Sequence, residues 1–158
     1  MQSRRKRSRQ LLIPTWSHSP PGVRVLVEHP EPIAREFLAE GLQARGYAVV
    51  TCGGPSPEDL AGAVRCPLLD GESCPAVGGA DVVVTSLNPL GDHEGLIVRN
   101  LTNHTGAPSV IVEATDWQMQ QAQLSDVAAV RHQYPFHDAD TVAAIVEATV
   151  AAHATGSH

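Results

Sequence analysis

Short apolar runs alternate with longer amphipathic segments along most of this chain. Five runs have the length and the β-branched content of strands, and they cover residues 23–27, 47–51, 81–86, 109–113 and 127–133. The run at 81–86 is continuous enough for a strand that is buried on both faces. Segments typical of helices cover 31–45, 91–104 and 116–124, and two more begin near 56 and 138. This alternation predicts an α/β fold with one parallel sheet covered by helices on both faces.

Local signals support several of these helices. The segment 31–45 places Ile33, Phe37, Leu38 and Leu42 near one face, and Gly46 ends it. The second helix is predicted to begin with Ser56 as the cap and Pro57 in the first turn.

The last helix is predicted to begin with Asp138 as its cap and to carry one apolar stripe, formed by Val142, Ile145, Val146 and Val150. The segment 66–79 is rich in proline and glycine, so it is predicted to be a loop. Parallel sheets of this kind place their sites at the carboxyl ends of the strands, where we look first for chemistry.

The chain divides into one domain and two tails. Residues 1–22 are charged and then Ser/Pro-rich, so they are predicted to form a disordered tail. The domain is expected to cover 23–153, and 154–158 a short C-terminal tail. No apolar run approaches the roughly 18–20 residues that cross a membrane, and no signal-peptide core follows the basic start. These features predict a cytoplasmic protein without a membrane contact.

Charge is distributed unevenly along the sequence. The formal net charge is -6, yet residues 1–10 contain five basic residues and no acidic one. An acidic domain with a short basic arm is not typical of a nucleic-acid-binding protein. Nucleic acid is therefore not an expected partner, except for weak contact through Arg4–Arg9.

Several fragments together resemble the receiver domain of bacterial response regulators. Residues 31–38 with Gly46-Tyr47 look like its first helix and the start of its second strand. Residues 81–87 are similar to its third strand, 107–112 to its fourth, and 134–136 to the turn after its fifth. The resemblance covers about 23–150 and implies a flavodoxin-like, three-layer αβα fold with five parallel strands in the order 2-1-3-4-5.

A working receiver has an acidic pair after the first strand that helps to hold Mg²⁺, and a phospho-accepting aspartate after the third. In this sequence His29 and Pro30 occupy the positions of the acidic pair, or Glu28 and His29 after a one-residue slip. Ser86 stands at the position of the aspartate.

The family also has a hydroxyl residue after the fourth strand and a lysine after the fifth, which bind the phosphoryl group. Glu113 and Tyr134 replace them in this sequence. A carboxylate repels phosphate, and a neutral tyrosine cannot replace an ammonium group. The resemblance therefore implies a degenerate phosphorylation pocket in a stand-alone pseudo-receiver, which regulates through protein–protein contacts without a cofactor.

We also considered a hydrolase, because Ser86, His29 and Glu113 could supply a nucleophile, a base and an orienting acid. The sequence lacks the G-x-S-x-G turn and a glycine-rich oxyanion loop, so no catalytic residue is assigned and no enzyme activity is expected. The family pairs through its fourth helix, fifth strand and fifth helix. This implies a protein partner or a homodimer through about residues 116–150.

Three cysteines provide an alternative hypothesis. Cys66 and Cys74 lie in a segment that is longer than receivers usually have between the second helix and the third strand. Their spacing exceeds that of zinc knuckles, and Cys52 follows the second strand. Either the loop or the strand-end pocket could sense a small ligand, a metal or the redox state, although packing roles for these cysteines are the simpler interpretation, and no metal ligand is assigned.

Overall fold

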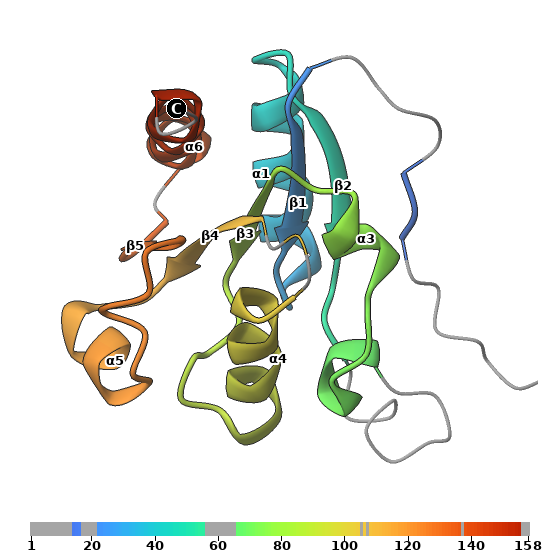
Figure 1. The fold of residues 1–158 in the computed structure, drawn as a ribbon. Helices are drawn as coiled ribbons and strands as arrows, with labels where there is room; N and C mark the ends of the chain where they lie inside the picture. The colour runs from blue at the N-terminus through green and yellow to red at the C-terminus, as the bar shows by residue number, and fades with distance from the viewer. Residues whose placement is uncertain are drawn as a thin grey trace, which may run out of the picture.

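A computed structural model describes residues 14–16, 22–55, 66–104, 106, 108–136 and 138–155. Its strands are β1 (Arg24–Glu28), β2 (Ala48–Cys52), β3 (Val82–Thr85), β4 (Ser109–Glu113) and β5 (Val130–Gln133). Its helices are α1 (Pro32–Gln43), the 3₁₀ helix η1 (Pro67–Asp70), α3 (Pro75–Gly78), α4 (Asp92–Thr102), α5 (Asp116–Gln121) and α6 (Ala139–Thr155) (Figure 1). The second helix expected from Ser56 lies outside the described residues.

The strands form one parallel sheet in the order β2-β1-β3-β4-β5. The flavodoxin-like prediction is therefore confirmed. Alternate residues of each strand point to opposite faces, so the sheet has a core on each side. Helices α1 and α6 cover one face, over Val25, Val27 and Val84, while α3, α4 and α5 cover the other (Figure 1). Strand β3 is fully buried, as predicted.

Helix α1 differs from its predicted packing. Leu38 and Leu42 are buried, but the side chains of Ile33 and Phe37 are 79% and 59% exposed. Each pair is spaced by four residues, and one turn of an α-helix takes about 3.6 residues, so the two pairs form separate stripes whose centres lie about 140° apart. Only the stripe of Leu38 and Leu42 faces the sheet.

The segment 66–79 is more ordered than the predicted loop. It contains η1 and α3, and each begins with a proline in its first turn. Leu68 and Val77 anchor the two short helices in the core. Proline begins each of these short helices and glycine follows each of them, and this composition indicated a loop. The helices themselves are too short to produce a helical period in the sequence.

Residues 14–16, which the sequence places in the N-terminal tail, contact the domain. The indole Nε1 of Trp16 donates a hydrogen bond to the carbonyl of Ala76 at 2.9 Å. Its ring packs against the core and lies so close to Gly79 that a Cβ there would be 2.3 Å from Trp16 Cδ1. The tail prediction does not account for this contact.

A capping interaction defines the start of α6. The backbone N–H of Thr141 donates to Asp138 Oδ1 at 2.7 Å, which confirms Asp138 as the predicted cap. Val142 and Val146 of the predicted stripe are buried, and Ile145 and Val150 are partly buried.

None of the helices in the described ranges combines the length and the apolar character needed to cross a membrane.

Candidate functional site

The residues of the predicted pocket lie where the parallel strands end together. The register pairs Glu28 with both Cys52 and Thr85, and Glu113 with Gln133. The residues that follow the strands, including His29 and Ser86, are therefore brought to one edge of the sheet. This is the edge that the sequence identified.

His29 is held by its neighbours. Its backbone N–H donates to the carbonyl of Cys52 at 3.0 Å, and its ring Nδ1 accepts from the N–H of Glu31 at 3.0 Å. Burial lowers the pKa of His29, an effect that the carboxylate of Glu113 opposes most strongly. Pro30 is exposed. Neither residue supplies the carboxylate oxygens that an Mg²⁺ cage requires.

Ser86 follows β3, and its backbone N–H donates to the carbonyl of Glu28 at 2.8 Å. Its hydroxyl oxygen is buried and forms no hydrogen bond with any described residue. The Ser–His–Glu relay that a hydrolase needs is therefore not formed among the described side chains.

Glu113 and Tyr134 end the other side of this edge. The Oε2 atom of Glu113 accepts a hydrogen bond from the backbone N–H of Phe136 at 2.6 Å. Its carboxylate thus fixes the turn after β5. The side chain of Tyr134 is 57% exposed. The phenol at the family's lysine position therefore remains accessible to solvent.

Glu28 has a role that the sequence does not predict. It is only 4% exposed, and the hydroxyl of Thr85 donates to its Oε1 at 2.7 Å. The same hydroxyl oxygen accepts from the N–H of Leu87 at 3.2 Å. Burial raises the pKa of Glu28 from 4.5 to about 7, against the opposing effect of Thr85. Because β1 is buried on both faces, its place in the sheet explains the burial of residue 28, but it does not reveal this partner.

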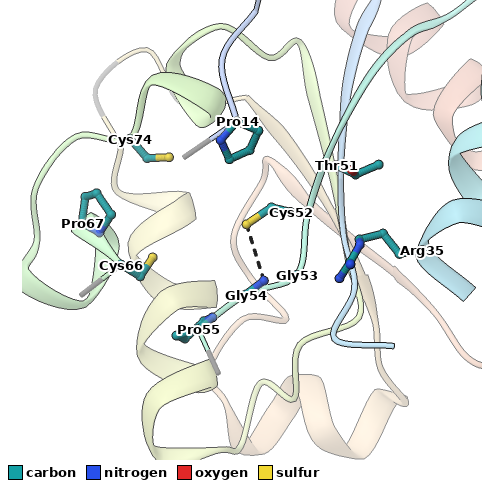
Figure 2. A pocket seen from close by; sticks show the side chains of 10 residues that line it. All are labelled: Pro14, Arg35, Thr51, Cys52, Gly53, Gly54, Pro55, Cys66, Pro67 and Cys74. Atoms are coloured by element: carbon teal, nitrogen blue, oxygen red, sulfur yellow. Dashed lines mark hydrogen bonds between the residues drawn. The ribbon is translucent and has the colours of Figure 1, made fainter. Parts of the chain in front are cut away.

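The three cysteines line one cavity of about 170 Å³ (Figure 2). Cys52 comes from the end of β2, Cys66 precedes η1, and Cys74 precedes α3. All three are free thiols. The sequence left open a sensing site in the loop of Cys66 and Cys74 or at the strand ends. The fold brings all three cysteines together, because η1 and α3 return the chain to the end of β2.

The chemistry of Cys52 and Cys66 differs from that of a reactive site. Burial raises the pKa of Cys52 to about 11 and also raises the pKa of Cys66. Reactive cysteines have a lowered pKa, because the thiolate is the nucleophile and the metal ligand. Within the described ranges, no three His, Cys, Asp or Glu side chains are placed to hold a metal ion.

Comparison with known proteins gives matches in structure alone. No protein-family model and no curated protein matches the chain. A response regulator receiver domain protein from Bacillus halodurans superposes with a TM-score of 0.54 at 11% sequence identity, over 80% of this chain and 96% of that chain.

Two further solved structures are similar. A Burkholderia thailandensis protein named for pilus assembly (cpaE) gives a TM-score of 0.57 at 12% identity, over 82% of this chain and 99% of its own. A chain from the complex of histidine kinase ThkA with response regulator TrrA gives 0.52 at 18% identity, over 81% of this chain and 98% of its own. At these identities the likeness shows a shared fold.

Proposed function

We propose that this chain, which has the fold of a response-regulator receiver domain, is a pseudo-receiver. It acts as a regulatory module through protein–protein contacts and carries out neither phosphotransfer nor another catalytic reaction. The observation that carries this proposal is the state of Ser86, whose buried hydroxyl has no hydrogen-bond partner among the described residues.

The surrounding groups support the same proposal. Phosphotransfer from a small donor needs a carboxylate acceptor and Mg²⁺ held by oxygen ligands. The two carboxylates that end neighbouring strands are already engaged, Glu28 by Thr85 and Glu113 by the N–H of Phe136. A serine at the acceptor position cannot form an acyl phosphate.

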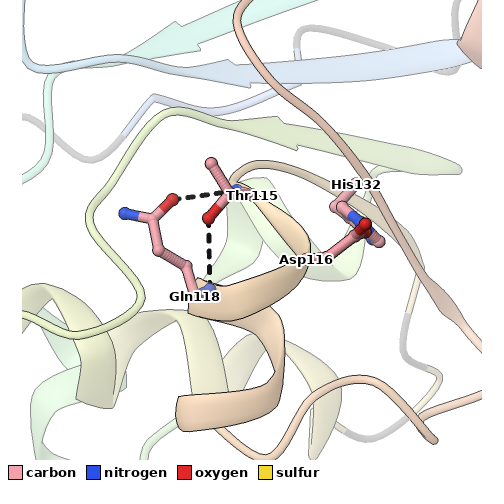
Figure 3. Close-up of polar contacts among 4 residues, drawn as sticks. All are labelled: Thr115, Asp116, Gln118 and His132. Carbon is pink, nitrogen blue, oxygen red and sulfur yellow. Dashed lines mark hydrogen bonds and ion pairs between the residues drawn. The ribbon is translucent and has the colours of Figure 1, made fainter.

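The partner surface is proposed to be the region 116–150. Thr115 and Gln118 form a reciprocal capping box that fixes the start of α5 (Figure 3). His132 of β5 contacts Asp116 of α5, with 2.6 Å between Nε2 and Oδ1. Trp117 is 62% exposed beside these contacts. A fixed backbone that presents a large aromatic side chain suits a protein interface.

Acetyl phosphate labelling tests the loss of phosphotransfer. The protein is incubated with acetyl phosphate and MgCl₂, and its intact mass is measured. We expect no phosphate adduct on the wild type, and none on Ser86→Asp, because the Mg²⁺ ligands are also missing. A stable adduct that disappears in Ser86→Ala would overturn the proposal.

Sedimentation equilibrium tests the partner surface as a homodimer contact. Trp117→Ser is expected to weaken self-association at least tenfold, since buried aromatic residues dominate interfaces. Ile33→Ser is the matched control, because it removes an exposed apolar side chain from α1. Equal self-association of the wild type and Trp117→Ser would exclude a homodimer through this surface.

A further inference from the structure

The cavity beside β2 is separate from the degenerate pocket. Its described lining includes none of Ser86, Glu113 and Tyr134. Prolines and the three cysteines form most of its wall, and Figure 2 shows the sulfur atoms of Cys52 and Cys74 pointing into the same space. The wall is mainly apolar. Arg35 is the one charged residue in this lining.

Arg35 is placed so that its charge remains available. Its Nη1 donates to the carbonyl of His29 at 2.9 Å, and Arg35 forms no ion pair with the described residues. A guanidinium group has five N–H donors in a planar fork. Apart from the bond to His29, the donors of Arg35 form no side-chain hydrogen bond with the described residues. Its Nη1 lies against Gly53, where a Cβ would be only 2.6 Å away. The absence of a side chain at Gly53 therefore lets the guanidinium reach the cavity.

The size of the cavity limits the apolar part of a ligand. A volume of about 170 Å³ is close to that of engineered cavities, roughly 150 Å³, that bind benzene. Sulfur atoms also make favourable contacts with aromatic rings. Because burial raises the pKa of Cys52 to about 11, its thiol is neutral near pH 7 and does not repel an anion.

We propose that this cavity binds a small aromatic carboxylate, with the ring between the sulfur atoms and the carboxylate paired with Arg35. The carboxylate and the guanidinium can form two parallel hydrogen bonds, the geometry that makes arginine selective for such groups. This inference does not rest on the proposed protein–protein function. It adds a ligand site at the carboxyl end of β2, and this site is separate from the degenerate pocket.

Isothermal titration calorimetry with benzoate tests the site, with benzamide and inorganic phosphate as comparison ligands. Benzoate is expected to bind saturably, and benzamide and phosphate at least tenfold more weakly, since each lacks one half of the recognised structure. Absence of saturable benzoate binding would overturn the proposal. Equal binding of benzamide would show that the negative charge is not recognised, and equal binding of phosphate would show that the ring is not recognised. Either result would also contradict the proposal.

Variants locate the binding. Arg35→Gln is expected to weaken benzoate binding about 10- to 100-fold, the range for a hydrogen bond to a charged group, while Arg99→Gln on α4 leaves it unchanged. Gly53→Ala keeps the guanidinium but displaces it, so this variant should also weaken benzoate binding. Gly78→Ala is its control and should leave binding unchanged, because the added Cβ makes only an ordinary 3.6 Å contact with His104 Cε1. Wild-type affinity in folded Arg35→Gln, checked by circular dichroism, would contradict the assignment.

Discussion

Glu28 is a buried carboxyl group whose protonation should control the pH dependence of stability. Its side chain has one hydrogen bond, from the Thr85 hydroxyl, and burial raises its pKa from 4.5 to about 7. Between these two values the folded protein holds a proton that the unfolded chain has released. The free energy of unfolding must therefore fall as the pH rises through this interval.

The size of the effect follows from the two pKa values. Each pH unit between them contributes roughly 1.4 kcal/mol, so ionisation of Glu28 destabilises the folded protein by about 3 kcal/mol above pH 7. Glu28→Gln has nearly the same shape and remains neutral. The variant should equal the wild type in stability near pH 4 and exceed it by about 3 kcal/mol near pH 8.5.

Urea unfolding followed by circular dichroism at several pH values measures this difference. Glu40→Gln is the control, because Glu40 is an exposed glutamate on α1, and its stability curve should run parallel to that of the wild type. A constant difference between Glu28→Gln and the wild type across the whole range would refute the reasoning, since it would mean that Glu28 titrates alike in both states.

Two further substitutions test the packing of the fold. Gly41→Ala would place a Cβ 2.2 Å from Ala139 Cβ, so it should force α1 and α6 apart and cost about 2 kcal/mol in urea unfolding; unchanged stability would show that the helices are not held this closely. Trp16→Phe removes the hydrogen bond to Ala76, so it should cost about 1 kcal/mol and speed limited proteolysis before Val23, and an unchanged cleavage rate would contradict that anchor.

The parallel sheet could be predicted because apolar runs of strand length alternate with helical segments, and the resemblance to receiver domains implied the strand order. Strand boundaries were less accurate, and β5 begins at Val130 rather than at residue 127. Residues 127–129 are apolar, but they belong to a turn in which the N–H of Val130 bonds to the carbonyl of Val127. Composition alone does not distinguish such a turn from the start of a strand.

Packing between elements explains what the sequence could not predict. Ile33 and Leu38 are equally apolar, and only the position of the sheet decides which of them is buried. Likewise, Trp16 lies in a polar, proline-rich region, and its contact with Ala76 depends on α3, a helix of four residues. Long-range contacts of this kind leave no periodic signal in the sequence.

The candidate site was predicted in position but not in detail. The receiver resemblance placed His29, Ser86 and Glu113 at the carboxyl edge, and the parallel register brings this edge together. The contact of Glu28 with Thr85 depends on two strands in the correct register and could not be read from either strand alone. The cavity of the three cysteines likewise required the path of residues 66–74.

The central claim is that a receiver fold persists here without a working phosphorylation pocket. Two-dimensional NMR of the ¹⁵N-labelled protein, titrated with MgCl₂ and then with beryllofluoride as a phosphoryl mimic, tests this most directly. We predict that the amide signals of His29, Ser86 and Ala114 stay unchanged, because no carboxylate cage or acceptor is available at the strand ends. Saturable shifts of these signals that require both Mg²⁺ and beryllofluoride would contradict the account.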